Sequence, residues 1–150
     1  MYKRIMVAVD DAFATDNVLH AAIALAKQSG ARLAVCHALD ETIFARRQAE
    51  VLLPGTIGQV TQSLSDGARQ FLDQAAAVVR AAGLEVDVRV VQSEASNVAE
   101  MLAEAAAEWQ ADLLVVGSHS QRGIDRFFVG SLAEQLVRKA QTSLLLVRSD

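Results

Sequence analysis

A chain of 150 residues that is 52% hydrophobic but only 5% aromatic can bury a core built mainly from Ala, Val and Leu, as a single domain. Its net charge of −4 argues against a nucleic-acid partner, because binding a phosphate backbone requires clustered Lys and Arg. The single cysteine, Cys36, excludes an internal disulfide, and no apolar run approaches the roughly 18 residues of a membrane span, so we expect a cytoplasmic protein.

The start of the chain predicts a strand, a helix and a second strand. Ile5 to Val9 is a continuous apolar run, as expected for a central parallel strand that is buried on both faces. A helix is expected from about Thr15, which suits an N-cap, to Gly30, which suits a C-terminal stop. The second strand spans about Ala31 to Leu39, and we expect Cys36 within it to be a buried small hydrophobe. Together these elements form a β-α-β unit.

The middle of the chain predicts an irregular segment, a long helix and an edge strand. Thr42 to Gly58 contains the turn pair Pro54-Gly55 and forms either a lid over a site or an ordinary surface loop. We favour the surface loop. A long amphipathic helix is expected from about Thr61 to Gly83. Leu84 to Val90 then alternates apolar and charged residues. This pattern predicts an edge strand with charged residues on one side, which disfavour pairing with another chain.

A third helix is expected after a cap at Ser93 or Ser96, and its apolar stripe ends at Trp109. The periodicity predicts that Trp109 packs in the core or at its rim and is not a stacking platform for a ligand. The fourth strand, Asp112 to Val116, leads into a glycine loop.

The stretch from Gly117 to Ser131 lies between the fourth strand and the last helix, where α/β proteins bind phosphates. Gly117 permits close approach to the backbone, Ser120 offers an amide and a hydroxyl, and the helix that begins near Ser131 adds free N–H groups and its positive dipole end. A second interpretation needs no ligand: Gly117 is a strand-end turn, and Ser131 with Glu134 is a capping box. The spacing alone leaves both interpretations open.

The last helix and strand predict a subunit contact. The helix is expected to bury Leu132, Leu136, Val137 and Ala140. The strand from Ser143 to Arg148 has an apolar core and, as the last strand, is expected at a sheet edge. Because an unguarded apolar edge favours pairing with another chain, we predict a homodimer through this strand.

The sequence contains no pattern that predicts a catalytic or metal site. The motifs of zinc proteases, dithiol redox proteins, serine hydrolases and P-loop enzymes are absent, and His20, His37 and His119 show no metal-ligand spacing. Asp10 and Asp11 could hold Mg²⁺ beside a triphosphate, or could simply cap the following helix. We therefore expect no catalytic residues, and at most weak ATP hydrolysis.

Across nearly its whole length the chain resembles the universal stress protein family. The resemblance is carried by Ile5-Met6-Val7-Ala8-Val9-Asp10, Cys36-His37-Ala38, Val115-Val116-Gly117-Ser118-His119, Val129-Gly130-Ser131-Leu132-Ala133-Glu134 and Leu144-Leu145-Leu146-Val147. It implies an α/β fold of the adenine nucleotide alpha hydrolase-like type: an open five-stranded parallel sheet, order 3-2-1-4-5, with helices on both faces. It also implies dimerisation through the last strand.

The resemblance implies ATP as the cofactor, with one departure from the pattern of the members that bind it. In those members the loop has a sequence pattern similar to Gly, any two residues, Gly, any nine residues, Gly, and then Ser or Thr. Here Gly117, Gly130 and Ser131 match, but Ser120 occupies the second glycine position. If the loop requires a positive φ there, a side chain costs roughly 1 kcal/mol, which weakens binding less than tenfold. Ser120 also keeps its backbone N–H and can add a hydroxyl donor.

Carried over by position, the resemblance implies a nucleotide site formed by Ala8, Val9, Asp10, Ala38, Val116, Gly117, His119, Ser120, Gly130, Ser131 and Leu132. Residues of the first two strands would line the adenine slot, Asp10 would lie near the adenine or ribose, and the glycine loop would surround the ribose and phosphates.

The resemblance implies a regulatory or signalling protein of the stress response that binds ATP as a homodimer and presents its surface to a protein partner, whose identity the sequence does not reveal. The alternatives are an interaction protein of the same fold with an empty site, and a slow ATPase.

Overall fold

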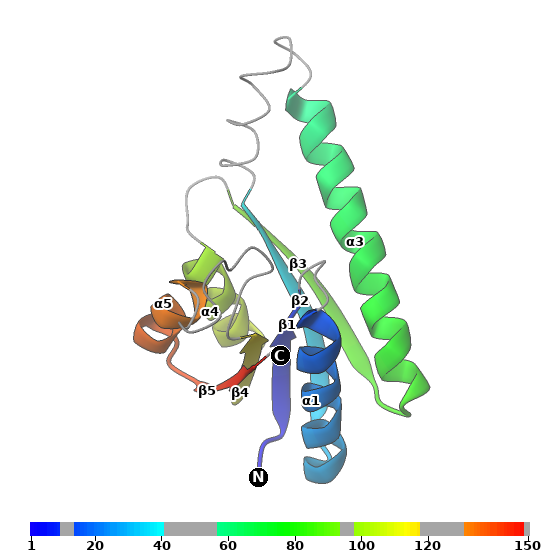
Figure 1. Ribbon diagram of the computed structural model, residues 1–150, viewed down its shortest axis with the longest axis vertical. Helices are drawn as coiled ribbons and strands as arrows, with labels where there is room; N and C mark the ends of the chain where they lie inside the picture. Colours follow the sequence, from blue (N-terminus) through cyan, green and yellow to red (C-terminus); the bar gives the residue numbers. More distant parts are fainter. Residues whose placement is uncertain (10–13, 41–56, 94–97, 118–130, 149–150) are drawn as a thin grey trace.

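The computed structural model describes residues 1–9, 14–40, 57–93, 98–117 and 131–148, which form a parallel sheet flanked by helices (Figure 1). In chain order the elements are β1 (Arg4–Ala8), α1 (Ala14–Ser29), β2 (Arg32–Asp40), α3 (Ile57–Ala81), β3 (Val86–Ser93), α4 (Val98–Glu108), β4 (Leu113–Gly117), α5 (Ser131–Lys139) and β5 (Ser143–Val147). The strand order β3-β2-β1-β4-β5 confirms the predicted fold, including the edge positions of the third and fifth strands.

Strand β1 lies at the centre of the sheet. It pairs in parallel with β2 on one side and with β4 on the other, so that Ile5 lies opposite both Leu33 and Leu113. Ile5, Met6 and Val7 are fully buried, as a run without polar alternation predicts for a strand covered on both faces.

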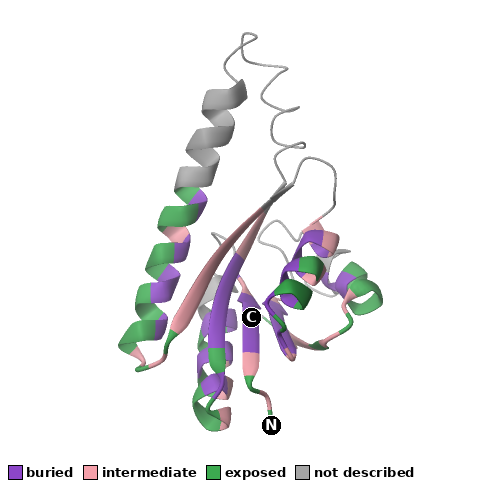
Figure 2. Cartoon of the chain, turned by 180° about the vertical axis from the view of Figure 1, so that it is seen from behind, coloured by how far each residue is buried: buried purple, intermediate pink, exposed green. Residues whose placement is uncertain are grey.

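Two hydrophobic cores form because successive side chains of a strand point to opposite faces of the sheet. One core lies beneath α1 and α3 and contains Val35 and Leu72; the other lies beneath α4 and α5 and contains Cys36 and Leu136. Figure 2 shows the buried residues lining the sides of the strands and helices that face one another. Cys36 is fully buried, as predicted.

Two details of the helices differ from the sequence-based expectation. Helix α3 begins at Ile57, not near Thr61, so the end of the segment expected to be irregular is helical. The prediction that Val137 is buried is wrong, since this residue is 63% exposed. Helix α5 packs chiefly against α4, and among its described side chains only Ala133 and Leu136 are buried, so Val137 lies outside the buried stripe.

At the amino ends of the strands, polar and aromatic side chains join β1, β2 and β3 to the turn between α4 and β4. We call Arg4, Arg32, Asp87, Trp109 and Asp112 the amino-edge network. The Arg4 guanidinium lies 4.0 Å from the centre of the Trp109 ring and donates to the Trp109 carbonyl at 2.9 and 2.7 Å. Trp109 is only 4% exposed, which confirms its predicted packing role.

The carboxylate of Asp87 in the edge strand β3 is the acceptor that links this strand to Arg32 of β2 and to Trp109. It accepts from Trp109 Nε1 at 2.9 Å and from Arg32 Nε and Nη2 at 3.1 and 2.8 Å. Asp112 accepts from the backbone N–H groups of Lys3 and Arg4. The hydrogen bond from Arg32 is the main cause that holds the pKa of Asp87 below its usual value.

Candidate functional site

The carboxyl ends of β1 and β4 define the candidate site. These strands are neighbours at the centre of the sheet, yet the helices that follow them, α1 and α5, cover opposite faces. The chain therefore leaves the two strands in opposite directions, which is the arrangement that opens a ligand crevice outside the carboxyl ends of an α/β sheet. Figure 1 shows β1 and β4 ending close together, whereas β2 continues beyond them.

Small residues line this edge. Ala8 at the end of β1, Ala38 near the end of β2 and Gly117 at the end of β4 are all half-buried. Ala8 and Ala38 pack against the core beneath α4 and α5, so their short side chains lie on the same face of the sheet. Val9 and Val116 are buried at 4% and 2% exposure. Among the described residues, the edge therefore combines a buried apolar base with small side chains at the strand ends, which suits a flat apolar ring.

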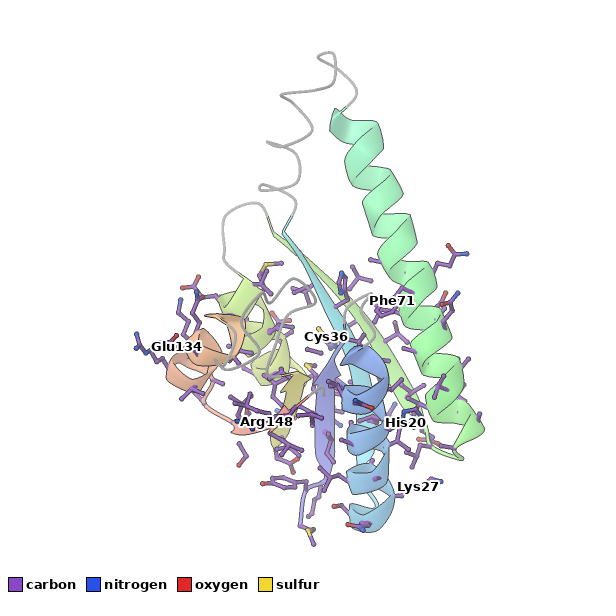
Figure 3. All side chains as sticks on the ribbon, viewed as in Figure 1. His20, Lys27, Cys36, Phe71, Glu134 and Arg148 are labelled. Atoms are coloured by element: carbon purple, nitrogen blue, oxygen red, sulfur yellow. The ribbon has the colours of Figure 1, made fainter. Side chains whose placement is uncertain are left out.

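Val9 is held on both sides of its peptide unit. Its N–H donates to the Cys36 carbonyl at 2.9 Å, and its carbonyl lies 2.8 Å from Nδ1 of His37. The His37 ring contacts Phe71 of α3 edge-on, with 6.1 Å between ring centres and 72° between planes. Figure 3 labels Phe71 on α3.

Cys36 is not a usable nucleophile beside this edge. Burial raises the pKa of its thiol to about 12, despite an opposing effect of Arg89, so the side chain stays protonated near neutral pH.

Over the described parts of the chain, no group of three or more His, Cys, Asp or Glu is placed to hold a metal ion. None of the described helices is long and apolar enough to cross a membrane.

The structure brings together part of the predicted site. Ala8, Val9, Ala38, Val116 and Gly117 all lie at or next to the carboxyl edge.

Other predicted residues are placed only in part or lie outside the described residues. Ser131 and Leu132 form the start of α5, but their side chains are outside the described set, so the proposed cap is not tested. Glu134 contacts Arg138, with Nη2 donating to Oε1 at 3.4 Å. Asp10, Asp11, His119, Ser120 and Gly130 lie outside the described residues.

Sequence reasoning missed His37 and Phe71. The strand alternation offered a signal for His37, because a residue next to the buried Cys36 must face the opposite side, towards α1 and α3. Nothing in the spacing indicated that Phe71 would lie against it, since the two residues belong to separate elements.

These features define an α/β protein whose central strands β1 and β4 are followed by helices on opposite faces of the sheet. The chain belongs to the universal stress protein family, whose model matches residues 1–148. A Staphylococcus aureus (strain USA300) protein named for this family is 28% identical over 151 aligned positions, which cover 99% of this chain and 86% of that protein. A solved member from Burkholderia pseudomallei is 29% identical, with a TM-score of 0.78, over 99% of this chain and 97% of that one.

Two further solved universal stress proteins share the fold and are complexes with nucleotides. One, bound to cAMP, is 24% identical with a TM-score of 0.69, over 99% of this chain and 98% of that one. The other, from Archaeoglobus fulgidus and bound to dAMP, is 22% identical with a TM-score of 0.66, over 97% of this chain and 98% of that one.

Proposed function

We propose that the chain binds an adenine nucleotide in the crevice between the carboxyl ends of β1 and β4, with ATP as the expected ligand. In this proposal it acts as a regulatory protein of the stress response. The observation that carries the proposal is the geometry of that edge: β1 and β4 are adjacent central strands whose helices cover opposite faces, and the small residues Ala8, Ala38 and Gly117 lie at or near the strand ends. Nucleotide complexes of two proteins with this fold support an adenine ligand.

The proposed assignment within the crevice follows the chemistry of its parts. Ala8 and Ala38, which share one face of the sheet, present an apolar surface on which adenine can lie, and the peptide unit of Val9 borders it. Gly117 allows the backbone to approach the ribose and phosphates, and the first turn of α5, beginning at Ser131, supplies N–H groups and a positive dipole end for negative charge. Asp10 would hold the adenine or ribose, and with Asp11 could bind Mg²⁺ beside a triphosphate.

Calorimetric titration of ATP, dAMP and cAMP, with and without Mg²⁺, tests this proposal. At a hundred times its dissociation constant a ligand stabilises the fold by about 2.7 kcal/mol, so a thermal shift provides a second readout. Gly117→Val adds an isopropyl group at the carboxyl end of β4, beside the proposed crevice, and should weaken binding at least about tenfold. Gly67→Ala is the matched control, because a methyl group at this exposed site on α3 meets nothing within 4 Å.

The expected result is saturable binding to the wild type and to Gly67→Ala, with binding lost or strongly weakened in Gly117→Val. Binding that is unchanged in Gly117→Val would place the ligand elsewhere. A protein that binds none of the three nucleotides, and releases none when freshly purified material is denatured, would be a nucleotide-free interaction protein of the same fold.

The proposal includes a homodimer formed through β5. Among the described strands β5 pairs only with β4, and Leu144 to Val147 are half-buried apolar residues at that edge. A second copy could pair with this edge and cover its apolar side chains. Light scattering should give a dimer mass at micromolar concentration and a monomer mass for Leu146→Lys. Val78→Lys, which changes an apolar residue 42% exposed on α3, should remain dimeric. A monomeric wild type would contradict this part of the proposal.

A further inference from the structure

The peptide unit at Val9 is fixed by a side chain from a different strand. Val9 directly follows β1, and its N–H continues the pairing with β2 by donating to the Cys36 carbonyl at 2.9 Å. Its carbonyl is beyond the last residue of β1 and is contacted by the ring of His37 at 2.8 Å. At the end of β1, the hydrogen bond from the His37 imidazole takes the place of a further backbone hydrogen bond between β1 and β2.

The acceptor determines which ring nitrogen of His37 carries the proton. A carbonyl oxygen can only accept a hydrogen bond, so Nδ1 must donate. The neutral ring is therefore the Nδ1–H tautomer, and its Nε2 is left as an acceptor. The orientation of the ring is supported by the edge-on contact with Phe71, at 6.1 Å and 72°, within the range that aromatic pairs prefer.

From this geometry we propose that His37 is a positioning residue of the nucleotide site, an inference that rests on the proposed function. The hydrogen bond from His37 fixes the Val9 carbonyl to β2, and so sets the position at which the chain leaves β1. Val9 lies in sequence between Ala8, which with Ala38 forms the alanine surface, and Asp10. His37 acts on the ligand through Val9, from the opposite face of the sheet to Ala8 and Ala38.

Two substitutions separate this role from simple packing. His37→Asn keeps an N–H donor near the place of Nδ1, because the amide nitrogen of Asn has the same distance from the backbone in bonds. His37→Leu fills a similar volume and donates nothing. Both remove the ring contact with Phe71, so both should lower the melting temperature of the ligand-free protein.

Calorimetric titration of dAMP and ATP, well below the melting temperature, provides the first test. His37→Leu should bind about five- to tenfold more weakly than the wild type, the size expected for one lost hydrogen bond, and His37→Asn should stay within about threefold. Phe71→Leu is the matched control: it removes the same ring contact but leaves the donor, and should also stay within about threefold. Equal affinity in the wild type and His37→Leu, or equally weak binding in His37→Leu and His37→Asn, would overturn the proposal.

Nitrogen NMR of the histidine rings provides a test that needs no ligand. In mildly alkaline buffer, the His37 signals, identified by their absence from His37→Asn, should show a protonated Nδ1 and an unprotonated Nε2. The opposite tautomer would overturn the proposal whatever the affinities. A wild type that binds no adenine nucleotide would overturn both the proposed function and the positioning role, whereas failure of the positioning role alone appears as normal wild-type binding that His37→Leu leaves unchanged.

Discussion

Replacing Asp87 in the amino-edge network tests whether these polar contacts stabilise the fold. Its carboxylate accepts two hydrogen bonds from Arg32 and one from Trp109 Nε1. Asp87→Asn keeps an oxygen that can still accept from the indole N–H but removes the charge that pairs with Arg32. Asp87→Ala removes both, and leaves the N–H of a tryptophan that is 4% exposed without this acceptor. The two variants therefore separate the ionic contribution from the cost of an unsatisfied buried donor.

The expected magnitudes follow from exposure. The Asp87 side chain is 34% exposed, so solvent screens its ion pair, and Asp87→Asn should lower the free energy of unfolding by only about 1 kcal/mol. Asp87→Ala should lower it by about 2 to 4 kcal/mol, because leaving a buried donor unpaired adds about 1 to 3 kcal/mol. For a domain of this size, each kcal/mol lowers the melting temperature by about 2 to 4 °C.

The pH dependence has a definite sign. Because the folded-state pKa of Asp87 is lowered, chiefly by the hydrogen bond from Arg32, the ionised carboxylate stabilises the fold at pH values above its ordinary pKa of 3.8. That contribution is lost as the pH falls from 3.8 through the lower folded value. The difference between the wild type and Asp87→Asn should therefore be constant near neutral pH and shrink in acid.

Urea unfolding followed by fluorescence measures these differences, since Trp109 is the only tryptophan and lies within the network. Glu134→Gln is the control, because it removes one charge from the exposed pair with Arg138 on α5 and should cost at most about 0.5 kcal/mol. If Asp87→Ala costs no more than Glu134→Gln, or if Asp87→Ala and Asp87→Asn are equally stable, the network does not stabilise the fold as argued.

Three further predictions concern the core and the helices. Leu72→Ala, at a fully buried residue of α3, should cost about 2 to 5 kcal/mol in urea unfolding, whereas Val78→Ala, at 42% exposure on the same helix, should cost much less; similar losses would contradict the described burial. A thiol reagent at pH 8 should modify Cys36 only when the protein unfolds, because burial raises its pKa to about 12; rapid modification of folded protein would contradict this. Gly30→Ala should lower the free energy of unfolding by about 1 kcal/mol, since Gly30 has a φ of +66°, whereas Gly67→Ala inside α3 should raise it by about 0.5 to 1 kcal/mol. Shifts of the same sign in the two variants would contradict the difference in backbone conformation between these glycines.

The order of the elements and the centre of the sheet could be predicted from the sequence, because they depend on local patterns. The unbroken apolar run from Ile5 to Val9 predicted a strand buried on both faces, and the alternation after Leu84 predicted an edge strand. Local patterns failed where burial depends on a distant neighbour. The spacing on the last helix favoured a buried Val137, but α5 packs chiefly against α4, so this position is left exposed.

Long-range side-chain contacts could not be predicted in the same way. Arg4 and Trp109 are separated by 105 positions, and nothing in either local pattern indicates that a guanidinium lies over that indole ring. At the candidate site, the strand register places Ala8, Ala38 and Gly117 near one edge of the sheet, and their role in binding a nucleotide stays a prediction from the resemblance. His37 was missed because its partner is a backbone carbonyl, which carries no signature in the sequence.

The central position of β1 has a consequence for synthesis of the chain. During translation, β1 emerges before its partners and can pair with β2 once the β-α-β unit is complete, but its other side stays unpaired until β4, which begins at Leu113, is synthesised. A nascent chain that has not reached this point exposes the backbone groups of what will become the innermost strand. Ribosome stalling or truncation before Leu113 should therefore yield fragments prone to aggregate, although the finished protein keeps that strand furthest from solvent.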